Sequence, residues 1–183
     1  MYLSRTSSGG QSELKINGSG SAMSIGKVQI KPAFYKFHGE SLTHARTDVH
    51  VRDRVVTTDE PAERGGTNVG ASPTETMLSA LVGCTNNIAT KIAHHKKLEF
   101  EIESIDLEAE FDRRGVLMVE DIDIPFPNIK LTINVRTDAT AEQLAEVQAL
   151  LPQFCPVSKV FRAAGSKIVE EWNVVSPIFS AAS

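Results

Sequence analysis

The two cysteines of the chain have the residue type and the settings to carry out chemistry. Cys84 closes an apolar stretch, beginning at Glu75, that is typical of a buried helix, and Cys155 opens a Cys-Pro-Val-Ser sequence where a helical segment begins. Two cysteines alone provide too few ligands for a structural zinc site. As a dithiol, however, the pair could react with an oxidant and close to a disulfide.

Each cysteine also has a simpler interpretation. A cysteine in an apolar helix is often only a small buried hydrophobe, which would account for Cys84. Cys155 could be a loop residue after Phe154. A place at a helix N-terminus would instead favour its thiolate, because free backbone N–H groups and the helix dipole stabilise negative charge there. A disulfide requires Cα atoms within about 7 Å, and the order of residues along the chain leaves that distance open.

The composition is that of an ordinary globular protein. The 183 residues are 41% hydrophobic and 23% charged, with a net charge of -4. We therefore expect a flexible Gly/Ser-rich tail over residues 1–26 and a single domain over residues 27–183.

Several classes of protein are disfavoured by the same sequence. The chain has no strong basic patch, so we expect no nucleic-acid partner. No apolar run reaches the roughly 20 residues that a membrane-spanning helix needs, so we expect no membrane partner. The N-terminal region lacks the apolar core of a signal peptide, which favours the cytoplasm. A disulfide in that compartment is usually transient or catalytic.

The helix that must position Cys84 has the strongest signals in the chain. Pro73 suits a first helical turn, Ser72 is a candidate N-cap, and Glu75 has the spacing of a capping box, so we predict a helix over residues 73–95. Apolar residues lie on most of its sides, which indicates a central, buried helix.

The remaining elements are expected on both sides of this helix. Before the helix, alternating patterns predict a strand over 27–37, with Pro32 at an edge or bulge, and a strand or hairpin over 42–56, and turn residues predict a loop over 57–73. After it, alternation predicts a strand over 100–111, with a bulge near Ser104, and a strand over 129–135. Amphipathic patterns then predict helices over 140–151 and 156–164, followed by a closing strand over 167–175. This order predicts an α+β fold with an antiparallel sheet.

Three parts of the sequence together resemble the OsmC/Ohr superfamily. They are the Gly65–Pro73 segment, the helix from Glu75 to the Gly-Cys-Thr motif around Cys84, and the Cys-Pro-Val-Ser motif at Cys155. The similarity covers roughly residues 27–175. Members of the superfamily are thiol-dependent peroxidases that reduce organic hydroperoxides and, less well, hydrogen peroxide. The resemblance implies antiparallel sheets packed on a long buried central helix, and an intertwined homodimer with active sites at the subunit interface.

The resemblance also implies roles for the two cysteines. By position, Cys84 matches the peroxidatic cysteine and Cys155 the resolving cysteine. The first thiolate would attack the peroxide and become a sulfenic acid, which would condense with the second thiol to a disulfide. An external dithiol, often a lipoyl group in the family, would then restore both thiols. No metal and no bound cofactor is implied.

An arginine and a glutamate assist the peroxidatic cysteine in the family. Arg64 matches the arginine by position, with Arg46, Arg52 and Arg54 as rivals. Each of these arginines has the alternative of being a solvated loop charge.

The glutamate is displaced in this chain. The usual position, directly after the proline, holds Thr74, and Glu75 follows it. Glu75 lies nine residues before Cys84, about 180° around an ideal helix, so it is expected to cap the helix or to face the other subunit. This Pro-x-Glu spacing resembles a less-studied branch of the superfamily.

Two other functions are compatible with the same sequence. The same disulfide could serve a redox sensor, or the chain could be a non-catalytic protein that binds a small ligand in an apolar interface pocket. The His94-His95 pair could bind a metal, but adjacent helical residues face different directions, so a solvated helix end is the simpler interpretation.

Overall fold

The structure is a computed structural model that describes residues 30–176. The tail expected over residues 1–26 lies outside the described residues. The described helices and strands belong to one compact unit that begins at Lys36.

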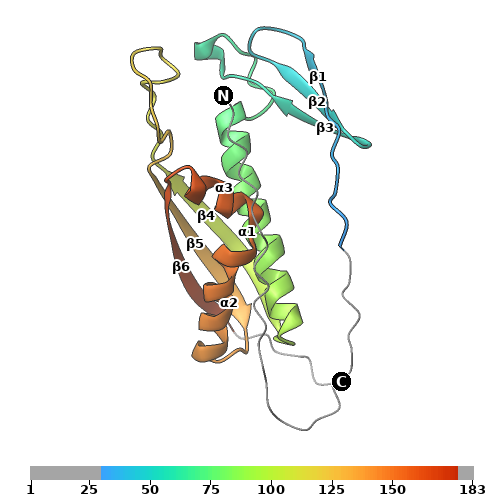
Figure 1. Cartoon of the computed structure of the whole chain (residues 1–183), viewed down its shortest axis with the longest axis vertical. Coiled ribbons are helices and arrows are strands. Elements are labelled where there is room, and N and C mark those ends of the chain that lie inside the picture. Colours follow the sequence, from blue (N-terminus) through green and yellow to red (C-terminus); the bar gives the residue numbers. More distant parts are fainter. Residues whose placement is uncertain (1–29, 177–183) are drawn as a thin grey trace, which may run out of the picture. The chain divides into compact units, whose positions relative to one another are not determined.

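A small antiparallel sheet opens this unit (Figure 1). Its strands are β1 (His38–Ser41), β2 (Thr47–Val51) and β3 (Arg54–Thr58), in the order β1-β2-β3. The predicted hairpin is therefore confirmed as β2 and β3. Arg52 lies in the tight turn between these strands with a positive φ of 56°.

The strand expected over residues 27–37 is wrong in its described part. Residues 30–37 form no β-ladder, and the first strand begins only at His38. Pro32 has no N–H group to donate to a neighbouring strand, which disfavours a regular β-ladder across this segment.

The second sheet carries the core. Its strands are β4 (Phe100–Ala109), β5 (Asn128–Thr137) and β6 (Lys167–Ser176), in the order β4-β5-β6. The predicted bulge lies where expected, between Ile102 and Ser104. Along β5, buried residues alternate with less buried ones, because one face of the sheet packs against helices.

The expected antiparallel arrangement is wrong for one strand pair. β4 and β5 are antiparallel, but β5 and β6 run parallel. Parallel neighbours need a crossover connection, which returns the chain to the end of the sheet where the first strand began. The two helices between β5 and β6 provide this connection.

The helices begin and end close to the predicted positions. They are α1 (Pro73–His95), α2 (Ala141–Phe154) and α3 (Pro156–Ala163), and the loop before α1 contains one 3₁₀ turn, η1 (Ala62–Arg64). α1 lies against β4, α2 and α3 (Figure 1).

Capping residues set where the two longer helices start. Ser72 accepts the N–H of Glu75, and the Glu75 carboxylate accepts the N–H of Ser72, which is a complete capping box. Thr140 and Gln143 form the same reciprocal pair at the start of α2. Because each box depends on residues three apart in sequence, sequence signals located both helix starts.

The predicted burial of α1 on most sides is wrong for the single chain. Its buried residues form one stripe, and Met77, four residues before Leu81, is 43% exposed. β4, α2 and α3 contact the helix, and its positions outside the stripe are half-buried or exposed. The buried positions are Leu81, Thr85, Ala89, Ile92 and Ala93.

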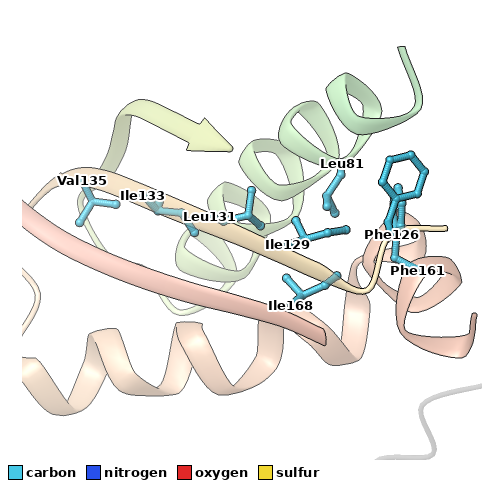
Figure 2. Close-up of a cluster of buried hydrophobic side chains, with 8 residues drawn as sticks. All are labelled: Leu81, Phe126, Ile129, Leu131, Ile133, Val135, Phe161 and Ile168. Carbon is cyan, nitrogen blue, oxygen red and sulfur yellow. The ribbon is translucent and has the colours of Figure 1, made fainter. Parts of the chain in front are cut away.

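Two apolar clusters hold the helices on the second sheet. Figure 2 shows the larger one, in which side chains of β5 meet Leu81 of α1 and Phe161 of α3. The smaller cluster joins α1 to α2 and includes Cys155. The larger cluster comprises Leu81, Phe126, Ile129, Leu131, Ile133, Val135, Phe161 and Ile168; the smaller comprises Ala89, Ile92, Ala93, Val147, Leu151 and Cys155.

Candidate active site

The fold brings the two cysteine side chains together. The sulfur atoms of Cys84 and Cys155 are 3.2 Å apart, and the Cys155 S–H donates to the Cys84 sulfur. Both thiols are free. Because a disulfide bond is about 2.05 Å long, a small movement of either side chain would bring the sulfurs to bonding distance when an oxidant accepts the two electrons.

Cys155 is held at the junction of two helices. Its backbone N–H donates to Leu151 at the end of α2, and its sulfur accepts the N–H of Ser158 at 3.4 Å as the N-cap of α3. Pro156 fills the first position of α3, where a missing N–H costs nothing. The Cys-Pro-Val-Ser sequence is therefore a helix start built around a sulfur cap.

Burial, rather than the helix dipole, dominates the ionisation of Cys155. The side chain is fully buried, and this burial, followed by its contact with Cys84, raises the pKa of the thiol to about 11. The sequence favoured a stabilised thiolate here; the two N–H groups of α3 that approach the sulfur offset only part of the burial. Cys155 thus keeps its proton near neutral pH, and the partly exposed Cys84 is the sulfur open to a reagent.

An apolar groove lies beside the cysteine pair, between α1 and α2. Ile88, one turn beyond Cys84, and Phe154, next to Cys155, both line it. Its volume is about 600 Å³. Its lining is mostly apolar, with basic side chains among the apolar ones. The lining residues are Ile88, Lys91, Ile92, His95, Lys96, Leu150 and Phe154.

Arg64 and Glu75 lie together, but away from the cysteines of the same chain. Both line a cleft of about 520 Å³ at the start of α1. Its lining residues are Glu60, Arg64, Ser72, Thr74, Glu75, Leu78, Phe111, Arg113, Val116, Leu117 and Phe126, which include neither cysteine. Glu75 and Cys84 are nine residues apart on α1, about 13 Å along the helix axis.

The Glu75 carboxylate is engaged at the helix start. It accepts the N–H of Ser72 at 2.7 Å. This hydrogen bond, the side chain of Ser72 and the positive charge of Arg64 hold the pKa of Glu75 below its usual value. The capping role expected from the sequence is therefore present, and the carboxylate stays ionised beside Arg64.

The rival arginines lie in the strands of the first sheet and in the connections between them. Arg46 pairs with Asp48 at 3.1 Å, and Arg54 pairs with its neighbour Asp53 at 3.4 Å. Arg52 occupies the turn itself. None of these three lines the cleft that contains Glu75, whereas Arg64 does. Arg64 itself pairs with Glu60 at 2.5 Å.

A buried carboxylate that the sequence did not single out organises the Arg64 loop. Asp59 is fully buried and accepts hydrogen bonds from the hydroxyl and N–H of Thr67, from the N–H of Val69 and from that of Glu60. The Thr67 hydroxyl, together with the backbone donors, lowers the pKa of Asp59 to about 2. A side chain at Gly66 would overlap the Glu60 carbonyl, so the loop closes tightly over the carboxylate.

A signal for this loop was present in the sequence. Asp59 follows a β-branched strand and opens a stretch rich in glycine, threonine and asparagine, residues that turn the chain and donate to a carboxylate. Since most aspartates in loops are solvated, only burial distinguishes this one.

Two further properties of the described part of the chain bear on its class. Within residues 30–176, no three His, Cys, Asp or Glu side chains gather as a metal ion would require. Over the same residues, the helices are too short or too polar to cross a membrane.

The fold and the site define an α+β protein with a paired dithiol between its central helix and a sulfur-capped helix. The family model for OsmC-like protein matches residues 65–171, more than half of the chain, so the chain belongs to the OsmC-like protein family. No curated protein is similar enough in sequence to be matched.

Solved structures agree on the fold. The chain is similar to the OsmC-like protein of Mycoplasma pneumoniae, with a TM-score of 0.66 and 15% identity over 79% of this chain and 99% of that chain. It is also similar to the organic hydroperoxide resistance protein OsmC of Legionella pneumophila (TM-score 0.51, 17% identity, 80% of this chain and 98% of that chain). The organic hydroperoxide resistance protein OhrB of Bacillus subtilis gives a TM-score of 0.51 and 20% identity over 77% of this chain and 98% of that chain.

Proposed function

We propose that this protein is a thiol-dependent reductase of organic hydroperoxides, in which Cys84 attacks the peroxide and Cys155 resolves the product. The 3.2 Å approach of the two sulfurs carries this proposal. Membership in the OsmC-like family and the fold shared with proteins named for organic hydroperoxide resistance support it. The Pro-Thr-Glu spacing at the start of α1 remains our reason to place the chain in a less-studied branch.

The proposed reaction proceeds in three steps. The Cys84 thiolate attacks the terminal, hydroxyl-bearing oxygen of the peroxide, and the O–O bond breaks. Cys84 becomes a sulfenic acid, and the leaving alkoxide takes up the proton that the Cys84 thiol had lost and departs as the alcohol. The Cys155 sulfur then attacks the Cys84 sulfur, and the thiol proton leaves with the displaced hydroxide as water. An external dithiol reduces the new disulfide by exchange and is itself oxidised to a disulfide. A lipoyl group would supply such a dithiol in a reducing compartment such as the cytoplasm.

The raised pKa of Cys155 keeps this thiol out of the first step; in the second step its proton has to leave as its sulfur attacks. A thiol that keeps its proton near neutral pH does not compete with Cys84 for the peroxide, because the thiolate is the nucleophile. It also brings the proton that the leaving hydroxide needs.

The groove beside the cysteines supports an organic substrate over hydrogen peroxide. Its apolar bed of about 600 Å³ starts one helical turn beyond Cys84, where the carbon chain of a hydroperoxide would lose contact with water. Hydrogen peroxide has no apolar group to bury.

We further propose that the working form is a homodimer in which Arg64 and Glu75 act on Cys84 of the partner subunit. Within one chain these residues line a cleft that excludes both cysteines. Met77 on α1 is 43% exposed, so a second copy of the chain could pack on the helix there. Apposed helices would let each cleft meet the other chain's thiol.

Thiol counting tests the reaction. When the fully reduced protein is mixed with excess cumene hydroperoxide, both free thiols are expected to disappear in a single chain-internal disulfide, because the sulfurs are already adjacent. Free thiols are counted with a chromogenic disulfide, and the bridge is located by peptide mass. Cys84→Ser is the control and is expected to keep its remaining thiol. Wild-type protein that keeps both thiols and consumes no peroxide would contradict the proposal.

Subunit complementation tests the shared site. Cys84→Ser and Arg64→Ala chains are each expected to be nearly inactive alone. Coexpressed with different tags, they should recover about a quarter of wild-type activity, since half of the dimers are mixed and each mixed dimer has one intact site of two. Purified mixed dimers with no more activity than either parent would show that Arg64 does not act across the interface.

A further inference from the structure

A chain of hydrogen bonds runs from Cys155 through α3 to β6. The N–H of Ser158 donates to the Cys155 sulfur at 3.4 Å. The Ser158 hydroxyl accepts from Nε of Arg162 at 3.2 Å, and Nη2 of the same guanidinium donates to the Glu170 carboxylate at 3.2 Å. One arginine therefore bonds on one side to the turn that caps the thiol and on the other side to the sheet.

The inner members of this chain are buried. Cys155 is 0% exposed and Ser158 is 2% exposed. The Glu170 side chain is 12% exposed, and burial raises its pKa while the ion pair with Arg162 opposes that rise. Buried polar groups of this kind are costly unless they are paired, so the pairing constrains where each can lie.

The helix that presents Cys155 needs such a constraint. α3 has eight residues, and isolated helices of that length are unstable in water, so contacts with the rest of the protein fix its position. Phe161 provides the apolar contact, on the face that enters the core. On the polar side, Arg162 joins the first turn of α3 to β6.

We propose that Arg162 is a positioning residue for the resolving thiol, holding the first turn of α3 so that the Cys155 sulfur stays beside Cys84. The effect of Arg162 on the rate of disulfide closure after peroxide attack rests on the proposed function. Its effect on the distance between the two sulfurs does not depend on which oxidant reacts. Lysine cannot replace this arginine. The planar guanidinium offers donors in two fixed directions, whereas an ammonium is a single point donor.

The kinetic test separates attack from resolution. In single-turnover mixing with cumene hydroperoxide, Arg162→Lys is expected to consume peroxide at the wild-type rate. Disulfide closure should slow about tenfold, the effect of losing one charge-assisted hydrogen bond. The sulfenic acid at Cys84 should accumulate and be trapped by dimedone. Lys159→Ala is the matched control, a cation on the exposed side of the same helix that makes no ion pair within the described residues, and it should close at the wild-type rate.

Ser158→Ala gives an independent variant. It removes the hydroxyl that accepts from Arg162 but keeps the backbone N–H that donates to the sulfur. Closure should slow as in Arg162→Lys, and the double variant should be little slower than either one, because both remove the same link. Equal closure rates in wild type and both variants would overturn the positioning role, as would equal slowing of attack and closure.

A second readout needs no peroxide. The disulfide is equilibrated with reduced and oxidised glutathione, and the effective concentration of one thiol at the other is calculated. Arg162→Lys should lower it about tenfold relative to wild type and Lys159→Ala. If wild type ignores hydroperoxide but this shift is found, the proposed reaction fails and the positioning role stands. An unchanged effective concentration overturns the positioning role whatever the outcome with peroxide.

Discussion

Replacing Cys84 with serine is expected to lower kcat/KM for cumene hydroperoxide by more than about 10³-fold, because a serine hydroxyl is not ionised near neutral pH and a thiolate is the nucleophile. Replacing Cys155 with serine is expected to have a different effect. The first oxidation should proceed at the wild-type rate, because Cys84 remains the partly exposed sulfur. Steady-state turnover with dihydrolipoamide should fall at least about tenfold, since the adjacent resolving thiol is lost.

Stopped-flow mixing and a coupled steady-state assay on the same preparations measure these two effects. Intact mass after one equivalent of peroxide should show the added oxygen on Cys84 in the Cys155→Ser protein and a disulfide in wild type. Two results would count against the assignment: a Cys84→Ser protein that still consumes peroxide, or a Cys155→Ser protein that keeps wild-type turnover. Wild type that oxidises once but does not turn over with dihydrolipoamide would favour a redox sensor instead.

Truncating Phe161 to alanine is expected to lower the free energy of unfolding by about 3–5 kcal/mol, the usual cost of removing a large aromatic side chain from a core. Phe161 is 2% exposed and packs edge-on against Phe126, with ring centroids 5.9 Å apart. In Figure 2 the Phe161 side chain extends from α3 into the apolar cluster formed with the side chains of β5. Because Cys155 caps this helix, its thiol should also react faster with a thiol reagent under native conditions.

Urea unfolding at fixed protein concentration measures the loss of stability, and fixed concentration matters if the chain dimerises. Val160→Ala is the matched control. Val160 is the preceding residue of α3 and is 59% exposed, so its truncation should cost no more than about 0.5 kcal/mol. Similar costs for the two variants would show that α3 is not held by the Phe161 contact.

Interactions between residues close in sequence made several elements predictable. The capping box of Ser72 and Glu75 set the start of α1, and the change of alternation near Ser104 marked the bulge of β4. The class of fold followed from the order of these elements.

Features that depend on distant neighbours were missed or mistaken. The segment over residues 30–37 has strand-like alternation but no ladder, and β6 pairs with β5 in the parallel direction. The apolar residues of α1 did not reveal which side the sheet covers. Strand pairing and burial are both decided by what another part of the chain, or a second chain, provides.

Patterns local to the sequence placed Cys84 on a helix and the start of a helical segment at Cys155, and they linked the two motifs to one family. Only the tertiary structure decided that the sulfurs lie 3.2 Å apart, that Arg64 shares a cleft with Glu75, and that Arg162 joins the Cys155 turn to Glu170. The physical reason is burial. A charged or thiol side chain has the same sequence signature in solvent as in the interior, and packing alone removes the water and selects its partner.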